Sequence, residues 1–140
     1  MSAWKFKEYR VPAGACPHGE NPFSAWYDAQ NPTVRSTLEA TIIILASTDD
    51  WNDPELKSFK ELTEKPADVG LSEVRFKVID GQKKRQFRVV GIWRQELHDF
   101  VFLMGLEKNG RSPNPPNAFE IARDLRLLMK EGKGLIYEHI

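Results

Sequence analysis

The amino-acid sequence predicts one α+β domain over residues 1–140: a twisted antiparallel sheet with N-terminal helices packed on one face and a C-terminal helix. Two observations lead to this fold class. Apolar residues recur at helical spacing before residue 48 and at every second position from residue 71 onward. Short turn signals separate the later segments, which is typical of an antiparallel meander. The length of 140 residues suits a single domain with its own core.

The composition favours an ordered protein of the cytoplasm. Apolar residues make up 41% of the chain, and 20 basic residues balance 20 acidic ones, which argues against intrinsic disorder. The single cysteine, Cys16, excludes an intramolecular disulfide framework and fits a reducing compartment. The longest apolar run, residues 42–46, is far shorter than the roughly 20 residues of a membrane span. We therefore expect a cytoplasmic protein without a signal peptide or a membrane partner.

The N-terminal half is expected to form a strand and then two helices. Residues 5–11 alternate between apolar and charged side chains, which predicts a strand. A helix begins near Pro22, where aromatic residues follow at helical spacing. A second helix begins at Asn31-Pro32, because Asn caps helices well and Pro is tolerated in a first turn. Its apolar stripe ends near Ser47.

Segment 48–69 is acidic and is interrupted by Pro54 and Pro66. Apolar residues at a spacing of three over residues 55–62 predict one or two helical turns. The sequence leaves open whether this segment covers the basic surface described below.

Three strands are expected in the middle of the chain. Residues 71–79 alternate between apolar and charged side chains, and Asp80-Gly81 follows as a favoured hairpin turn. Residues 85–93 alternate again. Residues 100–106 are apolar at nearly every position, as in a central strand that is buried on both faces. Together these segments predict an antiparallel meander.

The C-terminal part predicts a helix and a short end segment. A turn rich in Gly, Asn and Pro over residues 110–116 leads into a helix over residues 117–130, which has an apolar stripe. Gly132 and Gly134 end this helix. Residues 135–140 are expected to form either a short final strand or a tail.

The alternation in the first two strands of the meander separates an apolar face from a basic one. The apolar face is expected to pack against the helices and carries Val74, Phe76, Phe87 and Val89. The opposite face carries Arg75, Lys77 and Arg88. Because neighbouring strands lie about 4.8 Å apart, these three cations are expected to converge on a volume the size of a phosphate group.

The distribution of charge along the chain agrees with a basic face. Residues 70–111 contain 9 basic and 5 acidic residues and so net +4, whereas residues 1–69 contain 7 and 11 and net −4. A basic stripe of this kind is a candidate phosphate-binding surface, and a solvated sheet face beside an exposed hairpin is the alternative interpretation. The further candidate RNA-binding residues in this region are Lys83, Lys84, Arg85 and Arg111.

Cations on a rigid sheet suit metal-free cleavage of RNA by its own 2′-hydroxyl group. This reaction needs a base, an acid and positive charge on the non-bridging oxygens. Few proton carriers are present, and the candidates are His98, Tyr137 and His139, with Lys77 or Lys108 as an alternative base. Cys16 and His18 form a C-x-H pair, which alone does not make a metal site, so we expect no metal and no cofactor.

Five motifs in chain order resemble the phage-derived HigB-like branch of the RelE/ParE toxin superfamily. They span residues 20–130 and lie on the element types expected above. The motifs are Pro22-Phe23-x-x-Trp26, Gly70-Leu71-Ser72-Glu73-Val74-Arg75-Phe76, Gln86-Phe87-Arg88-Val89-Val90, Phe102-Leu103-Met104-Gly105-Leu106-x-Lys108 and Asn117-Ala118-x-Glu120-x-Ala122. Their shared order carries the resemblance.

The resemblance implies a RelE-like fold, with helices on one face of the sheet and a basic concave surface on the other. It implies the toxin of a type II toxin–antitoxin pair, which cleaves mRNA at the ribosome without a metal ion. A cognate antitoxin protein, mRNA and the ribosome are then the expected partners. The site residues of the family correspond to Arg75, Arg88 and Lys108 in this sequence.

Three functional hypotheses follow. The first is a metal-independent endoribonuclease toxin, for which the candidate catalytic residues are Arg75, Lys77, Arg88, Lys108 and His139. The alternative is a non-catalytic, prophage-derived interaction protein that binds a partner protein, and the neutral net charge favours it. Inhibition of gyrase, as in the ParE branch, ranks third because the cations on the strands favour RNA.

Overall fold

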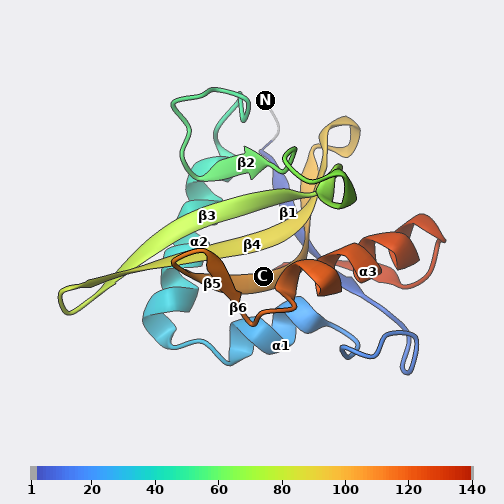
Figure 1. The fold of residues 1–140 in the computed structure, drawn as a ribbon. Coiled ribbons are helices and arrows are strands. Elements are labelled where there is room, and N and C mark those ends of the chain that lie inside the picture. Colours follow the sequence, from blue (N-terminus) through green and yellow to red (C-terminus); the bar gives the residue numbers. More distant parts are fainter. Residues whose placement is uncertain (1–2, 140) are drawn as a thin grey trace.

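A computed structural model describes residues 3–139 of the chain, which form one seven-stranded sheet flanked by three α-helices (Figure 1). The strands are β1 (Lys5–Arg10), β2 (Phe59–Glu61), β3 (Ser72–Asp80), β4 (Lys83–Arg94), β5 (Asp99–Asn109), β6 (Ser112–Asn114) and β7 (Leu135–Glu138). The helices are α1 (Pro22–Asp28), α2 (Pro32–Ala46) and α3 (Ala118–Lys130), with 3-10 turns η1 (Pro66–Asp68) and η2 (Gln95–Leu97). This confirms the α+β class.

The sheet is mixed rather than fully antiparallel. Its strand order is β2-β3-β4-β5-β1-β7, with β6 also paired to β5. The predicted meander is present as β3, β4 and β5, which pair antiparallel in sequence. The N-terminal strand β1, however, runs parallel to β5, and β7 pairs antiparallel with β1. The prediction of an antiparallel sheet is therefore wrong at β1, because a periodicity of two shows a strand but not its pairing.

Both N-terminal helices begin where the sequence predicts. The side-chain Oδ1 atom of Asn21 accepts a hydrogen bond from the Ser24 backbone at 3.1 Å, and Asn31 caps Val34 in the same way at 2.9 Å. A proline follows each cap, where its missing N–H group costs no helical hydrogen bond. None of the described helices combines the length and hydropathy that a membrane-spanning helix needs.

The predicted helical turns over residues 55–62 are wrong. Residues 59–61 form β2, which pairs with the start of β3 so that Phe59 lies opposite Val74. The Phe59 ring is buried against the rings of Trp51 and Trp93, with centroid distances of 5.1 and 4.9 Å. Packing of this aromatic side chain and the free edge of β3 outweigh the weak helical spacing of a short segment.

The face of the sheet that carries Val74, Phe76, Phe87 and Val89 packs against α1 and α2, as predicted; we call it the helical face. The Trp26 ring of α1 lies directly over Gly105, and the Phe23 ring lies 4.7 Å from that of Phe102. Helix α2 passes behind β3 and β4 in Figure 1.

The opposite face, which carries Arg75, Lys77 and Arg88, is called the basic face. Helix α3 packs there, and its Phe119 and Arg123 line the same cavity as Arg75 and Arg88. The arrangement differs from the helices on a single face that the family resemblance implies. The reason is that α3 has an apolar stripe of its own, which it buries against the sheet; the buried residues are Ala118, Ile121, Ala122 and Leu125.

Candidate functional site

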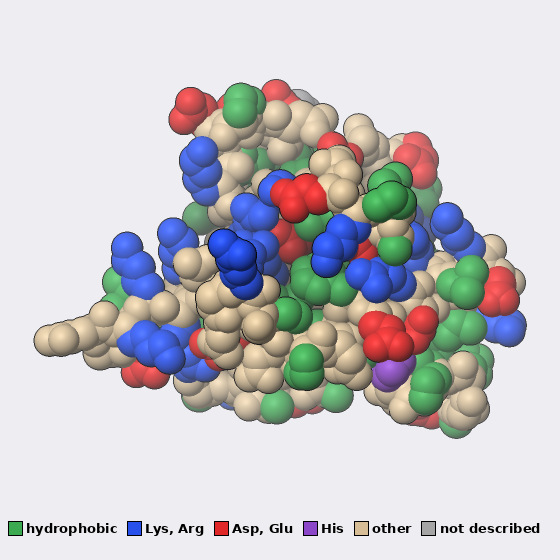
Figure 2. Space-filling model, in the orientation of Figure 1, with side chains coloured by type: hydrophobic (Ala, Val, Ile, Leu, Met, Phe, Trp, Pro, Cys, Tyr) green, Lys and Arg blue, Asp and Glu red, His purple; other side chains and the backbone are tan. Residues whose placement is uncertain are grey.

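A groove of about 640 Å³ lies on the basic face, between segment 60–68 and the start of α3. Its lining contains seven basic and four acidic residues, which sum to +3: Lys60, Lys65, Arg75, Arg88, Lys108, Arg111 and Arg123 against Glu64, Asp68, Glu73 and Glu120. We call this feature the basic groove. Figure 2 shows Lys and Arg side chains gathered around the middle of this face.

Arg75 and Arg88 form the floor of the basic groove. They lie directly opposite each other in the β3–β4 pairing, so the two guanidinium groups meet on one face. Both groups donate to a single oxygen, Oε1 of Glu73, through Arg75 Nε at 2.8 Å, Arg75 Nη2 at 2.7 Å and Arg88 Nη1 at 2.9 Å. The predicted convergence of these two arginines is therefore present, together with a carboxylate between them.

The ion pair with Glu73 leaves both arginines accessible from the groove. The Arg75 side chain is 30% exposed and that of Arg88 is 16% exposed, whereas Glu73 is fully buried. Burial lowers the pKa of Arg88, and the neighbouring Arg75 lowers it further, while Glu73 raises it. Each guanidinium group keeps N–H donors that Glu73 does not engage, because an arginine has five.

Lys108 and Arg111 line the same groove from the end of β5 and the turn that follows it. Neither forms an ion pair with any residue in the described part of the chain. Lys108 lies opposite Gln86, two positions from the Arg88–Leu106 pair and so on the same face of the sheet. Two unpaired cations therefore stand beside the arginine pair, as the sequence predicts.

Lys77 lies in a second cavity of about 910 Å³, which shares Lys60, Arg75 and Arg88 with the basic groove. This cavity runs along the outer edge of β3, because β2 pairs only with Ser72–Val74 and the last backbone bond joins the Arg75 amide to the Ser58 carbonyl. The arginine pair therefore borders both cavities.

The three residues after the hairpin turn are not part of the groove. Lys83 and Lys84 are exposed near the end of the β3–β4 hairpin, away from the residues that line the groove. Arg85 is on the helical face, where it forms a two-point ion pair with Glu107 at 2.8 and 2.9 Å and lies over the Phe87 ring. Side-chain alternation explains this, because Arg85 differs by an odd number of positions from Arg88.

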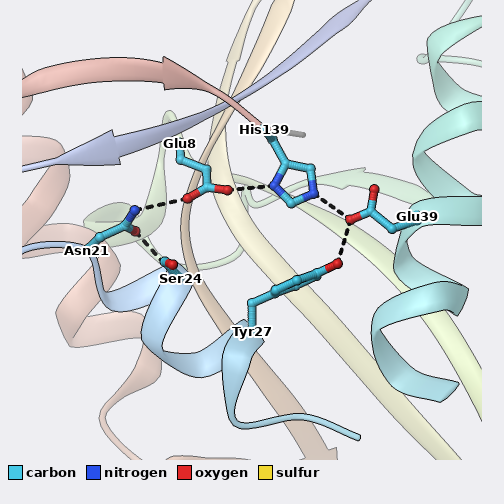
Figure 3. Close-up of polar contacts among 6 residues, drawn as sticks. All are labelled: Glu8, Asn21, Ser24, Tyr27, Glu39 and His139. Carbon is cyan, nitrogen blue, oxygen red and sulfur yellow. Dashed lines mark hydrogen bonds and ion pairs between the residues drawn. The ribbon is translucent and has the colours of Figure 1, made fainter. Parts of the chain in front are cut away.

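His139 is also separated from the arginine pair. Its Nδ1 atom lies 2.6 Å from Glu8 and its Nε2 atom lies 2.5 Å from Glu39, which also accepts from the Tyr27 hydroxyl at 2.9 Å (Figure 3). The imidazole packs against the Phe102 ring on the helical face and is 3% exposed. The sheet thus stands between His139 and the basic groove, and the structure does not bring the predicted catalytic histidine to the site.

The other two sequence candidates for proton transfer lie outside the groove as well. The His98 ring stacks on Trp4 with a centroid distance of 3.7 Å. Tyr137 is half exposed on β7, at the far edge of the sheet from β3. No histidine or tyrosine lines either cavity in the described part of the chain.

Several groove residues were not singled out by the sequence. Lys60, Lys65 and Arg123 join the lining because β2, η1 and α3 approach the basic face, and residue spacing does not reveal these approaches. Glu73 belongs to one of the motifs, and its place as an acid among the cations of a strand is the signal in the sequence that points to it.

Within residues 3–139, no group of three or more His, Cys, Asp or Glu side chains lies close enough together to hold a metal ion. In the C-x-H pair, Cys16 is buried and His18 lies 3.0 Å from Asp124 on α3. The pair therefore contributes to packing of the 11–21 loop against α3.

Comparison of the chain with models of protein families, with curated proteins and with solved structures returned no match.

Proposed function

We propose that this protein binds single-stranded RNA in the basic groove and cleaves it without a metal ion, as the toxin of a type II toxin–antitoxin pair that acts on mRNA at the ribosome. The observation that carries the proposal is the meeting of Arg75, Arg88, Lys108 and Arg111 in one open groove. The motif order supports it, and so does the succession of β1, two helices and a three-stranded meander, which is in keeping with the family resemblance.

The groove offers the electrostatic part of the reaction. Attack of the 2′-oxygen on phosphorus breaks the bond to the 5′-oxygen and places extra negative charge on the non-bridging oxygens. Arg75 and Arg88 would stabilise this charge through the N–H groups that Glu73 leaves free. In this proposal the neutral amine form of Lys108 accepts the 2′-hydroxyl proton and becomes the ammonium ion, and the 5′-oxygen takes a proton from solvent in the open groove.

The test is controlled induction of the full chain in a bacterial host, with sequencing of RNA ends that carry a 5′-hydroxyl group. Wild-type protein is expected to stop growth and to produce discrete cuts in mRNA. Lys108→Ala/Arg111→Ala is expected to abolish both effects. The control Lys5→Ala/Lys130→Ala removes the same charge outside the groove and is expected to behave like the wild type. Normal growth and intact mRNA with the wild-type protein would contradict the proposal.

One observation favours the alternative of a non-catalytic interaction protein on the same scaffold. Neither cavity of the described chain is lined by His or Tyr, the usual proton carriers. Mixing purified protein with ribosomes and mRNA separates the two functions. A nuclease produces cuts, an RNA-binding protein without activity protects a footprint, and a protein that binds only another protein does neither. A cognate antitoxin remains the expected partner of the nuclease.

A further inference from the structure

Glu73 is unusual in a groove that is otherwise arranged to attract anions. The carboxylate is fully buried, its Oε1 atom accepts from both Arg75 and Arg88, and its Oε2 atom has no hydrogen-bond partner among residues 3–139. A buried acceptor without a partner destabilises the folded protein. The negative charge also subtracts from the attraction that the groove exerts on a polyanion.

Attraction of a polyanion therefore does not account for this residue, and the unpartnered Oε2 atom weighs against a role in stability alone. The carboxylate instead fixes the position and orientation of two like-charged groups relative to each other. Arg75 and Arg88 lie directly opposite each other, where guanidinium groups alone would repel and turn toward solvent. With both groups bound to one oxygen, they stay side by side, and their N–H groups need no rearrangement when a ligand arrives.

We propose that Glu73 is a positioning residue: its Oε1 atom holds Arg75 and Arg88 as a pair whose remaining N–H groups bind the two non-bridging oxygens of one phosphodiester. Arg75 keeps Nη1, and Arg88 keeps Nε and Nη2, for this purpose. The inference rests on the proposed function, because it assigns the scissile phosphate of the RNA to this pair.

The decisive variant is Glu73→Gln, compared with Glu55→Gln. Both changes remove one negative charge, and Glu55 is exposed outside the two cavities. A neutral amide is a weaker acceptor than a carboxylate and no longer offsets the repulsion between the two guanidinium groups. We expect Glu73→Gln to bind an RNA oligonucleotide as tightly as the wild type or more tightly, yet to cleave it about 100-fold more slowly in single turnover. Glu55→Gln is expected to cleave at the wild-type rate.

A second variant covers the case in which Glu73→Gln fails to fold. Glu73→Asp keeps the negative charge but shortens the side chain by one methylene group. Any effect of this variant therefore comes from the position of the carboxylate and not from its charge. We expect slower cleavage with little change in the dissociation constant. Cleavage at the wild-type rate by either variant would overturn the positioning role.

An NMR measurement distinguishes failure of the positioning role from failure of the proposed nuclease activity. An all-deoxy oligonucleotide lacks the 2′-hydroxyl group and cannot be cut, but it presents the same phosphodiesters. In wild-type protein, its addition is expected to shift the Nε–H signals of Arg75 and Arg88 together in NMR spectra, and Glu73→Gln is expected to lose this joint shift. If RNA is never cut but the joint shift occurs, the nuclease proposal fails and the positioning role stands. If neither arginine responds in the wild type, the positioning role fails.

Discussion

Each ring nitrogen of His139 faces a carboxylate, Glu8 at Nδ1 and Glu39 at Nε2. Both contacts are hydrogen bonds only if both nitrogens carry a proton, which requires the charged imidazolium. Burial alone would lower the pKa of His139, but the two carboxylates outweigh it and raise the pKa. Burial likewise would raise the pKa of Glu8, but hydrogen bonds from His139 and Asn21 lower it. This network ties the end of β7 to α1 and α2.

The raised pKa of His139 predicts a pH dependence of stability. The stabilisation from His139 is complete below its unfolded pKa of about 6.5 and is lost as the pH rises through the higher folded value. The lowered pKa of Glu8 adds stability that is present above about pH 4.5 and lost at lower pH. We therefore expect His139→Gln to cost about 1–3 kcal/mol at pH 6, because it leaves two partly buried carboxylates without a charged partner, and to cost less at pH 9.

Thermal unfolding at the two pH values measures this difference. The control is His18→Gln, which removes the other histidine that faces a carboxylate, in a contact with the half-exposed Asp124. A loss of stability that is equal at pH 6 and pH 9 for His139→Gln would contradict the charged network.

Tyr27 joins the network by donating a hydrogen bond from its hydroxyl group to Glu39. Burial, followed by the hydrogen bond to Glu39, raises the pKa of Tyr27 to about 12. We expect the phenol to stay protonated well beyond the ordinary value near 10, as an absorbance titration at 295 nm would show for wild type against Tyr27→Phe. An ionisation near 10 that disappears in Tyr27→Phe would show that the bond to Glu39 is absent.

At the scale of elements, local patterns and long-range pairing behave differently. The alternation in residues 71–79 and 85–93 correctly predicts which side chains share a face, because a strand has only two faces. The β5 strand is harder to predict, since its register with β4 moves by one position between Val90 and Gly91. Phe102 and Gly105 consequently both face α1 although their spacing is odd. Single-sequence spacing holds no signal for such a bulge, or for the parallel pairing of β1.

The close approach of α1 to β5 depends on Gly105. A Cβ atom at this position would lie 2.1 Å from the Trp26 ring, so Gly105→Ala must displace the indole or the strand. We expect a loss of about 1–3 kcal/mol in the free energy of unfolding, measured by urea denaturation. The same substitution in a Trp26→Leu background is expected to cost clearly less, because the ring is gone. An equal loss of unfolding free energy in the two backgrounds would show that the contact between Trp26 and Gly105 does not determine how closely α1 packs on β5.

At the scale of the whole molecule, neutral net charge conceals a groove with a net of +3. The basic middle of the chain, residues 70–111, supplies Arg75, Arg88, Lys108 and Arg111. Strand alternation predicts the first two, and the end of the third strand predicts Lys108 and Arg111. The acidic segment 48–69 does not simply cover it: the segment adds Lys60 and Lys65 to the rim together with two acids. Residues that the packing of β2, η1 and α3 brings to the groove could not be predicted from the spacing of residues in the sequence.

Salt dependence tests whether these cations contact phosphates. The logarithm of the RNA association constant should fall with the logarithm of salt concentration by about 0.7 for each phosphate contact to a single strand. Lys108→Ala/Arg111→Ala is therefore expected to reduce the slope by about 1.4, and Lys5→Ala/Lys130→Ala to leave it unchanged. Equal slopes for wild type and the groove variant, in a fluorescence anisotropy titration, would place the RNA elsewhere.

The most direct test is incubation of the purified protein with programmed ribosomes and mRNA. The buffer contains EDTA and just enough Mg²⁺ to keep the ribosomes intact. The RNA ends that carry a 5′-hydroxyl group are then mapped. We expect discrete cuts, and on naked RNA at full chelation the cuts are expected to persist at a lower rate. They should vanish with Lys108→Ala/Arg111→Ala but not with Lys5→Ala/Lys130→Ala. Absence of cuts with the wild-type protein, or equal cutting by the groove variant, would contradict the account.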